Sequence, residues 1–488
     1  MSQSKMSNVP TKANIEGFVK RGYTLVEPSL SEDFHRDVYT QLSRVFQSMH
    51  NDFNPHNNIL PMVPQLWKVL DDPVVQQTIT SILGENYLLH VHRHPHISRG
   101  QPKQKTPAMR QPFHKDGHAV KPRPRHREPW WLIMFYYPQT VDLHNGPTGL
   151  LPGTHVLPEL GVEEDWYNPP KIEQKRDQLF LTDQYVQPNI HPLTCKAGSV
   201  AFTHFDIGHG AMMNGTEFDR FACKFVIMRT QRPTDRGGEE FKLKDPVSRH
   251  IGRWLGYSTQ ENENISFADW KAAFINSEIR ERVNALYMSA SVDDKSAVRD
   301  TLLKDISNRL PSENGDWILD IADASNGLAL LGEPEPIEGL LNKDNEGYLI
   351  NGCFSAGQAG DPVFVPRLNE LVKHQNPLVQ RHAMSALGLI GPTPNQNETI
   401  SALDSVIRSS SDWDLKVYAI QALIRQGALS ETIPGLAIAA KDANTYVNAF
   451  AIEQLCRIDD DRARSAVIEP LRRHRWMEDP RYEQGKSL

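Results

Sequence analysis

The chain has 488 residues, which is too long for a single hydrophobic core, so two or three domains are expected. Hydrophobic residues make up 39% and charged residues 23% of the sequence, as in an ordinary globular protein. The net charge of −7 argues against a general nucleic-acid binder and against binding to anionic membranes. Four widely separated cysteines form no CxxC pair, which argues against a disulfide framework or a thiolate zinc site.

The start of the chain, MSQSKMSNVPTKANIEG, is polar and lacks the apolar segment of a signal peptide. No run of 18 or more apolar residues is present, so the sequence predicts no membrane span. We therefore expect a cytoplasmic protein.

The first 245 residues or so are expected to form short strands, because Gly, Pro and Asn separate segments rich in β-branched and aromatic residues. A helix over 31–46 precedes them, with Ser31 as its N-cap. Such a series predicts an antiparallel barrel or jelly roll. The predicted strands cover 86–95, 130–141, 198–206 and 220–230.

From about residue 246 the pattern becomes helical, and beyond about 340 it repeats. Val379, Ala383 and Leu387 share one helical face, and the same spacing returns 36 and then 32 residues later, each time after an Asp- or Asn-bearing turn. The later copies are Leu415, Ala419 and Leu423, then Val447, Ala451 and Leu455, with a weaker early copy expected around Ile350 and Phe354. This pattern resembles HEAT repeats of the short bilin-lyase type, and the alternative is a bundle of ordinary amphipathic helices.

A candidate metal site begins at His114 and Asp116, which share one face if they lie on a strand. Two histidines and one carboxylate leave three positions of an octahedral iron open, which suits a bidentate co-substrate and dioxygen. His209 lies between Gly208 and Gly210, which leave room for an ion. Arg220 follows eleven residues later, where it can bind a dicarboxylate through paired hydrogen bonds.

A second HxD pair, His204 and Asp206, competes with the first. Arg220 then lies sixteen residues after the histidine rather than eleven, so we expect His204 to pack within its strand. We expect His155 to fix its turn and His118 to lie on a solvated loop, and at least one of Trp130 and Trp131 to be in the core.

Four motifs in order resemble the phytanoyl-CoA dioxygenase family of Fe(II)- and 2-oxoglutarate-dependent oxygenases: FVKRGYTLVEPSLSEDF, FHKDG, NGPTGLLPGTH and HGAMMN with its trailing arginine. The resemblance covers about the first 240 residues. It implies a double-stranded β-helix core, with His114, Asp116 and His209 as iron ligands and Arg220 as the anchor for the distal carboxylate of 2-oxoglutarate. Thr148 and Lys115 are further candidate co-substrate contacts. Many members have Gln at the position of Lys115, and a cation there favours an anionic substrate.

The predicted fold is therefore α+β and multidomain. Residues 1–245 are expected to form the double-stranded β-helix (jelly-roll, cupin-like) barrel with flanking helices. Residues 246–340 are expected to form a helical connection packed on the barrel, and residues 341–488 the HEAT-like repeats. The expected cofactors are Fe(II), 2-oxoglutarate and O2.

The predicted function is hydroxylation of an unactivated C–H bond in a small organic substrate, with 2-oxoglutarate converted to succinate and CO2. Desaturation or rearrangement in secondary metabolism uses the same residues and stays open. The rival interpretations are an inactive barrel within an interaction scaffold, and a barrel that binds another divalent metal for non-oxidative chemistry. A homo-oligomer or a protein partner bound through the repeats is compatible with the sequence, and no nucleic-acid or membrane partner is expected.

Two further segments allow more than one interpretation. The stretch HVHRHPH places His90, His92, His94 and His96 on one strand face, as pocket lining, as structural histidines or as an independent metal site. The basic segment KPRPRHREPWW contains Lys121, Arg123, Arg125 and Arg127. It is either a solvated loop or a lid that attracts a phosphate or carboxylate.

Overall fold

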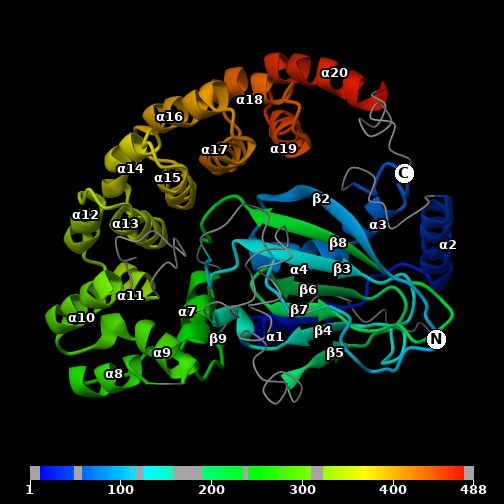
Figure 1. Ribbon diagram of the computed structural model, residues 1–488, viewed down its shortest axis with the longest axis horizontal. Helices are drawn as coiled ribbons and strands as arrows, with labels where there is room; N and C mark the ends of the chain where they lie inside the picture. Colours follow the sequence, from blue (N-terminus) through cyan, green and yellow to red (C-terminus); the bar gives the residue numbers. More distant parts are fainter. Residues whose placement is uncertain are drawn as a thin grey trace, which may run out of the picture.

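The N-terminal half carries two antiparallel sheets with helices packed beside them (Figure 1). The structure, a computed structural model, describes residues 11–48, 58–111, 113–116, 125–157, 189–234, 240–276, 278–308 and 323–476. The helices of this half are α1 (Lys12–Arg21), α2 (Glu32–Ser48), α3 (Leu66–Leu70) and α4 (Pro73–Leu83). The predicted N-cap is confirmed, because the Ser31 hydroxyl accepts a hydrogen bond from the Phe34 amide at 3.2 Å.

The larger sheet has five strands in the order β1-β6-β3-β8-β2, and the smaller has three in the order β5-β4-β7. The strands of the larger sheet are β1 (Tyr23–Val26), β6 (Val200–His204), β3 (Trp131–Tyr136), β8 (Arg220–Arg229) and β2 (Tyr87–Ser98). Those of the smaller sheet are β5 (His191–Leu193), β4 (Thr148–Leu151) and β7 (Gly208–Ala211). All four strands predicted from the sequence are present. A two-residue parallel pair, β9 (Glu240–Phe241) with β10 (Ser258–Thr259), lies apart from both sheets.

Alternating side chains of the larger sheet enter two different cores. On β3, Ile133 and Phe135 face a core shared with Leu150 of the smaller sheet, whereas Leu132 and Met134 face the opposite side. The two sheets therefore enclose a layer of apolar side chains between them. The five-stranded and three-stranded sheets are separate within the described residues, so a closed barrel is not observed and the double-stranded β-helix stays a prediction.

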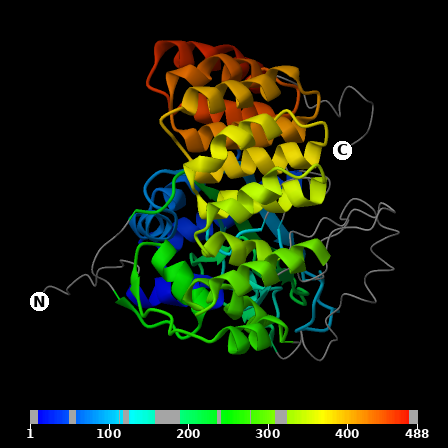
Figure 2. The same ribbon diagram turned by 90° about the vertical axis from the view of Figure 1, so that its left-hand side faces the viewer.

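The C-terminal half is a curved array of helices in two rows, stacked in successive layers (Figures 1 and 2). An inner row runs through α11, α13, α15, α17 and α19, and each outer helix packs on an inner one. The inner helices are α11 (Ala324–Leu330), α13 (Glu346–Ala359), α15 (Pro377–Ile390), α17 (Trp413–Gln426) and α19 (Thr445–Leu455). The outer helices are α10 (Lys295–Asn308), α12 (Pro334–Leu341), α14 (Val365–Leu371), α16 (Gln396–Ser409), α18 (Ile433–Ala439) and α20 (Asp461–Trp476), and α7 (Pro246–Trp254), α8 (Phe267–Phe274) and α9 (Ile279–Leu286) precede the array.

The polar turns singled out in the sequence begin the inner helices. Asn376, Asp412 and Asn444 are the N-caps of α15, α17 and α19, and each side chain accepts a backbone N–H of the first turn at 2.8–3.0 Å. Asn345 caps α13 in the same way. The three predicted apolar triplets lie on α15, α17 and α19 and are buried. Four of the five inner helices, α13, α15, α17 and α19, therefore start with the same kind of side-chain cap, whereas the Asp323 side chain forms no such bond at α11. The buried stripe recurs on α15, α17 and α19, as the predicted repeat requires.

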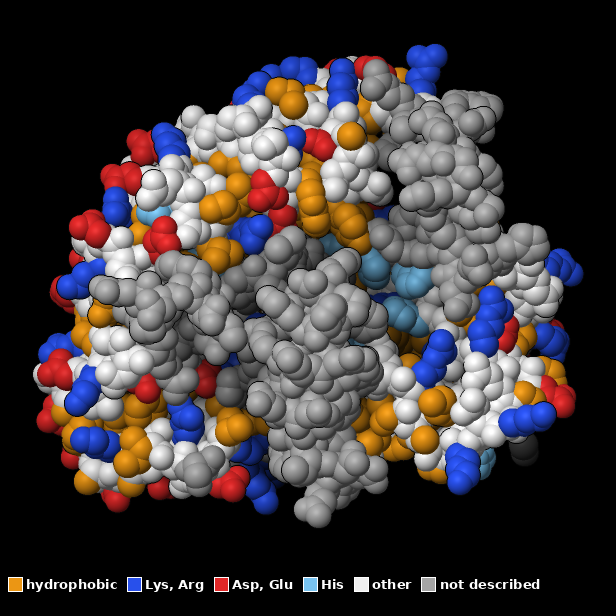
Figure 3. Space-filling model, in the orientation of Figure 1, with side chains coloured by type: hydrophobic (Ala, Val, Ile, Leu, Met, Phe, Trp, Pro, Cys, Tyr) orange, Lys and Arg blue, Asp and Glu red, His pale blue; other side chains and the backbone are white. Residues whose placement is uncertain are grey.

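The inner row of the repeats faces the larger sheet rather than solvent (Figure 1). A recess remains between the two halves on one face of the molecule, where histidine side chains gather below hydrophobic side chains of the repeat helices (Figure 3). The repeat array is short, and its concave side is covered by strands of its own chain. A short array of repeats buries little apolar surface by itself, and here the sheet of the same chain covers its inner helices.

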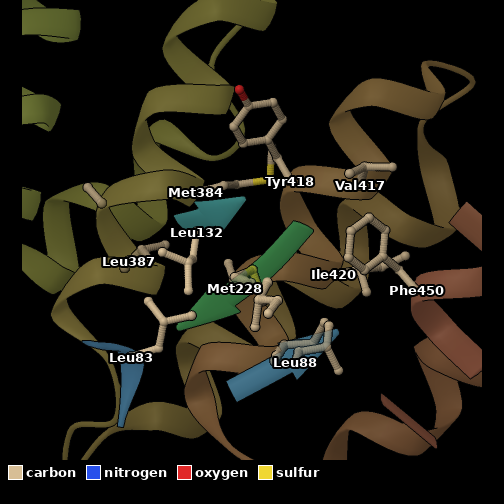
Figure 4. Packing of buried hydrophobic residues seen from close by; sticks show 14 of the residues in the cluster. Leu83, Leu88, Leu132, Met228, Met384, Leu387, Val417, Tyr418, Ile420 and Phe450 are labelled. Carbon is tan, nitrogen blue, oxygen red and sulfur yellow. The ribbon is translucent and has the colours of Figure 1, made fainter. Parts of the chain in front are cut away.

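One continuous apolar core joins the sheet to the repeats (Figure 4). Leu132 of β3 and Met228 of β8 are fully buried in the same cluster as Leu387 of α15 and Ile420 of α17. Phe450 of α19 packs edge-on against His90 of β2, with 4.7 Å between the ring centroids. Because β2 is an edge strand of the sheet, α19 covers an edge that would otherwise offer unpaired backbone groups.

Buried polar contacts at residues 125–131 add to this junction. The Glu128 carboxylate is 3% exposed and lies 2.8 Å from His250 Nε2 of α7, and it accepts a 2.8 Å hydrogen bond from the Gln358 amide of α13. Arg127 pairs with Asp323 at 2.6 Å. The Arg425 guanidinium of α17 lies over the ring of Trp130, which is buried as predicted. The junction is therefore both apolar and specifically hydrogen-bonded.

Among the described residues, no helix combines the length and the apolar character needed to cross a membrane.

Ending the chain after residue 340 should give an insoluble or aggregating protein, because α13, α15, α17 and α19 would no longer cover their side of the larger sheet. Size-exclusion chromatography and thermal unfolding of the two forms check this expectation. A monodisperse truncated protein with the melting temperature of the full chain would show that the repeats are an independent module.

Candidate metal centre

Three side chains predicted as metal ligands meet at one point between the sheets. One nitrogen each of His114 and His209 and one oxygen of Asp116 all lie within 4.8 Å of one another. Asp116 Oδ1 is 3.7 Å from His114 Nε2 and 3.9 Å from His209 Nε2. The side chains are only 14%, 12% and 7% exposed for His114, Asp116 and His209 respectively. No other group of three such residues this close occurs within the described ranges.

The backbone fixes the two histidines relative to each other. His114 and His209 form an isolated antiparallel bridge with two hydrogen bonds of 2.9 Å, which extends the smaller sheet beyond β7. The Thr154 hydroxyl, in the PGTH turn, accepts a hydrogen bond from the Gly208 amide at 2.8 Å and thereby holds the start of β7. Residues of the sequence motifs around these histidines thus hold the two histidines in place by backbone and side-chain hydrogen bonds.

The orientation of the His209 ring suits metal binding. Its Nδ1 lies 3.1 Å from the Ile207 carbonyl oxygen, so the ring donates from Nδ1 and presents the lone pair of Nε2 to Asp116 and His114. Burial, and then the neighbouring His114, lower the pKa of His209 to about 4. The imidazole is therefore neutral near pH 7, the form that binds a metal. The donor set of two imidazoles and one carboxylate with open positions fits a non-haem Fe(II) ion.

Arg220 begins β8 and is held close to the turn that follows the metal-binding residues. The Asn214 amide donates to the carbonyls of Ser98 and Phe218 at 2.8 Å each and fixes the turn between β7 and β8. Arg220 Nε donates to the Gly146 carbonyl at 2.7 Å, where the backbone φ of +78° favours glycine.

The Arg220 side chain is 2% exposed and forms no ion pair with any carboxylate that the structure describes. Burial lowers its pKa, because desolvation disfavours the cation. A buried arginine bound only to carbonyl oxygens is suited to an anionic ligand.

Thr148 is connected to Arg220 through Tyr137, although Thr148 and Arg220 lie in different sheets. Its hydroxyl is 2.9 Å from the Tyr137 hydroxyl, and Tyr137 interacts electrostatically with Arg220. Burial raises the pKa of Tyr137, so the phenol keeps its proton. The sequence did not single out Tyr137, because a tyrosine at the end of an apolar strand resembles an ordinary core residue. The structure thus brings Thr148, Tyr137 and Arg220 into one polar cluster.

The two lysines near the metal centre point to different partners. Lys115 Nζ donates to the Leu157 carbonyl at 2.8 Å, and a co-substrate role for this residue stays a prediction. Lys224 of β8, which the sequence analysis did not select, forms an ion pair with Asp116 Oδ2. Its signal was present in RFACKFVIMR, where a single lysine interrupts an otherwise apolar stretch four residues after Arg220.

The histidines of β2 divide between two roles. His90 is fully buried against Trp131 and Phe450, as a structural histidine. His92, His94 and His96 form a row with ring centroids 6.0 and 5.0 Å apart. His92 Nδ1 lies 3.2 Å from the Tyr446 hydroxyl of α19, and His96 interacts electrostatically with Asp116. This row runs from the repeats toward the metal centre, and the pocket-lining interpretation for these three residues stays a prediction.

The remaining candidates are structural wherever they are described. His204 is buried with Nε2 3.1 Å from the Arg127 carbonyl oxygen, and His155 has Nε2 3.1 Å from the Val19 carbonyl oxygen. Neither lies in the metal-binding group. Arg125 forms an ion pair with Asp206, the carboxylate of the second HxD pair. His118, Lys121 and Arg123 lie outside the described residues.

Comparison with known families assigns the two halves of the chain. The family model of phytanoyl-CoA dioxygenase (PhyH) matches residues 20–222, and that of HEAT repeats matches residues 333–424. Residues 20–222 are thus similar to the phytanoyl-CoA dioxygenase family, and residues 333–424 are similar to HEAT repeats. The comparison with curated proteins found no match.

Several solved structures are similar to a part of this chain. EctD from S. alaskensis, crystallised with 2-oxoglutarate and 5-hydroxyectoine, is 18% identical with a TM-score of 0.33 and covers 46% of this chain and 78% of its own. The carbocyclase SnoK from nogalamycin biosynthesis is 16% identical with a TM-score of 0.34, covering 45% of this chain and 84% of its own. EvdO2 from Micromonospora carbonacea var. aurantiaca is 18% identical with a TM-score of 0.33, covering 45% and 91%.

Replacing His114, Asp116 or His209 by Ala should weaken Fe(II) binding by more than about 100-fold, since even residues that only orient a ligand contribute 10–100-fold. His204→Ala and His92→Ala should keep about one Fe(II) per chain. Anaerobic titration with metal analysis of the protein measures both. Loss of iron from His204→Ala with retention in His209→Ala would show that the third ligand is assigned to the wrong histidine.

Proposed function

We propose that the chain is a non-haem dioxygenase that depends on Fe(II) and 2-oxoglutarate and hydroxylates a C–H bond of a small organic substrate. In the overall reaction 2-oxoglutarate and O2 are converted to succinate and CO2. The observation that carries this proposal is the pairing of two sites: a His-Asp-His group within 4.8 Å, and a buried Arg220 for which the described residues supply no carboxylate partner. The match of residues 20–222 to the phytanoyl-CoA dioxygenase family supports the same reaction class.

One set of residues would bind the metal and another would bind the co-substrate. His114, Asp116 and His209 would hold Fe(II) and leave open positions for the keto-acid end of 2-oxoglutarate and for O2. Bound iron supplies the oxidising chemistry. Arg220 would bind the distal carboxylate of 2-oxoglutarate, with the Thr148 and Tyr137 hydroxyls beside it as further hydrogen-bonding groups. This arrangement fixes the direction in which the co-acid enters.

Burial contributes to the chemistry by excluding water. Phe135 stands 6.1 Å from the His209 ring, edge to face, and is 4% exposed. Ala222 lies on β8 between Arg220 and Lys224 and is 1% exposed. An apolar surround strengthens the interaction of a carboxylate with Arg220 and limits uncoupled reaction with water.

We also propose the domain division at residues 245 and 340 and the double-stranded β-helix topology of the first part. The facing antiparallel sheets and their shared apolar layer support that topology.

The proposal predicts succinate release from 2-oxoglutarate that requires both Fe(II) and O2 and is abolished in Asp116→Ala. Mass spectrometry of the reaction, with and without ascorbate, measures it, and His204→Ala is the control that should retain turnover. A chain that binds Fe(II) but forms no succinate would instead support an inactive scaffold or non-oxidative metal chemistry.

Arg220→Ala should weaken 2-oxoglutarate binding by about 2–5 kcal/mol, the usual cost of removing one partner of a desolvated charge pair. Calorimetric titration of the anaerobic Fe(II)-loaded protein measures the dissociation constant. Arg408→Ala is a matched control, because it removes an arginine paired with Asp404 on the repeats. Unchanged affinity in Arg220→Ala would move the anchor to another cation.

A further inference from the structure

Lys224 is a buried cation on β8, and its side chain points toward the metal centre. It lies four residues after Arg220, so the two side chains point to the same side of the strand. Lys224 is 5% exposed, and its ion pair uses Oδ2 of Asp116, while Oδ1 lies nearer the two histidines. Strand β8 therefore supplies two of the cations of the site, Arg220 at its start and Lys224 four residues later.

The hydrogen-bonding capacity of Lys224 exceeds what the described residues provide. An ammonium group has three donors, and the Asp116 carboxylate is its one hydrogen-bond acceptor within the described ranges. His94 stands directly opposite Lys224 in the β2–β8 register. The Nδ1 atom of His94 is buried without a hydrogen-bond partner among the described residues. Two polar groups with unused capacity thus adjoin the metal centre, and buried polar groups are normally satisfied.

The charges around these two groups favour an anion. Burial, and then the charge of Lys224, lower the pKa of His94 to about 4, so the imidazole is neutral near pH 7 and can donate one hydrogen bond. A divalent cation held by Asp116 would share the negative charge that now balances Lys224. The ammonium would then need a second negative partner, because an uncompensated buried charge is costly.

We propose that Lys224 and His94 form the anchor for an oxyanion group of the substrate, so that the enzyme selects carboxylated or phosphorylated molecules. This inference rests on the proposed function and adds the substrate class to it. The sequence predicted an anionic substrate because of Lys115, and the present inference attributes the same preference to Lys224. The row from His94 to His92 continues to Tyr446 of α19, so the body of the substrate would extend along the row toward the recess beneath the repeats (Figure 3).

The inference makes Lys224 more than a partner that orients Asp116. If Lys224 served only to orient Asp116, replacing Lys224 would weaken metal binding and leave the preference for an anion unchanged. If it anchors the substrate, metal and 2-oxoglutarate binding stay close to normal while anion binding is lost. The two roles therefore differ in which affinity changes.

Small probes allow the test before any substrate is known. The full chain is loaded with Mn(II) and 2-oxoglutarate, and acetate, methylphosphonate and acetamide are titrated while the paramagnetic broadening of their methyl proton signals is recorded. Acetate or methylphosphonate should be broadened far more than the neutral acetamide, and the stronger of the two identifies a carboxylate or a phosphoryl group. In Lys224→Met this preference should fall by about tenfold or more, since hydrogen bonds to charged groups contribute that much.

Two variants serve as controls. Lys224→Arg keeps the charge and should retain part of the anion preference. Lys416→Met removes a lysine of the repeats that is likewise paired with an aspartate, at 2.6 Å from Asp442, and should behave as the unmodified chain. Calorimetric titration with Mn(II) and then 2-oxoglutarate verifies loading of every variant.

Each result has a defined meaning. Equal broadening by acetate and acetamide in the unmodified chain, or an anion preference that survives in Lys224→Met, would overturn the anchor while leaving the oxygenase proposal intact. Loss of Mn(II) from Lys224→Met but not from Lys224→Arg would assign Lys224 to Asp116 alone and also overturn the anchor. Failure of the unmodified chain to bind Mn(II) and 2-oxoglutarate would instead count against the proposed function itself.

Discussion

The two-residue alternation of strand β8 is the constraint on which both the packing and the site depend. Phe221, Cys223, Phe225 and Ile227 point to the core shared with the repeats, and Arg220, Ala222, Lys224 and Val226 point to the space between the sheets. A shift of one residue in register would exchange these two sets and place both cations in an apolar core. The apolar face that binds the repeats thus also fixes the depth and direction of the charged groups on the other face.

The apolar face of the larger sheet also explains why the repeats form one unit with the N-terminal half. The inner helices bury apolar side chains against the larger sheet, and α19 covers the edge strand β2 that carries the histidine row. Arg93 of β2 forms an ion pair with Glu453 of α19, and His92 meets Tyr446 on the same helix. A HEAT array that commonly offers its concave side to a partner here uses that side within its own chain.

The sequence predicted those structural features that depend on residues close together in the chain. The four strands, the Ser31 cap and the capped repeat helices followed from side-chain alternation and from residues that accept backbone N–H groups. The three metal-binding candidates were predicted through motifs and do meet in space. The partners of Lys224, Tyr137 and Glu128 could not be predicted, because each contact joins segments that are separated in the chain. Sequence spacing placed the expected cation at Lys115, whereas in the fold Lys224 of β8 forms the ion pair with Asp116.

Diffraction at the iron absorption edge, from crystals grown anaerobically with Fe(II) and 2-oxoglutarate, tests the central claim most directly. We predict a single anomalous peak between His114 Nε2, Asp116 Oδ1 and His209 Nε2, with the distal carboxylate of 2-oxoglutarate on Arg220. A peak at the row His92, His94 and His96, or at His204 and Asp206, would contradict this account.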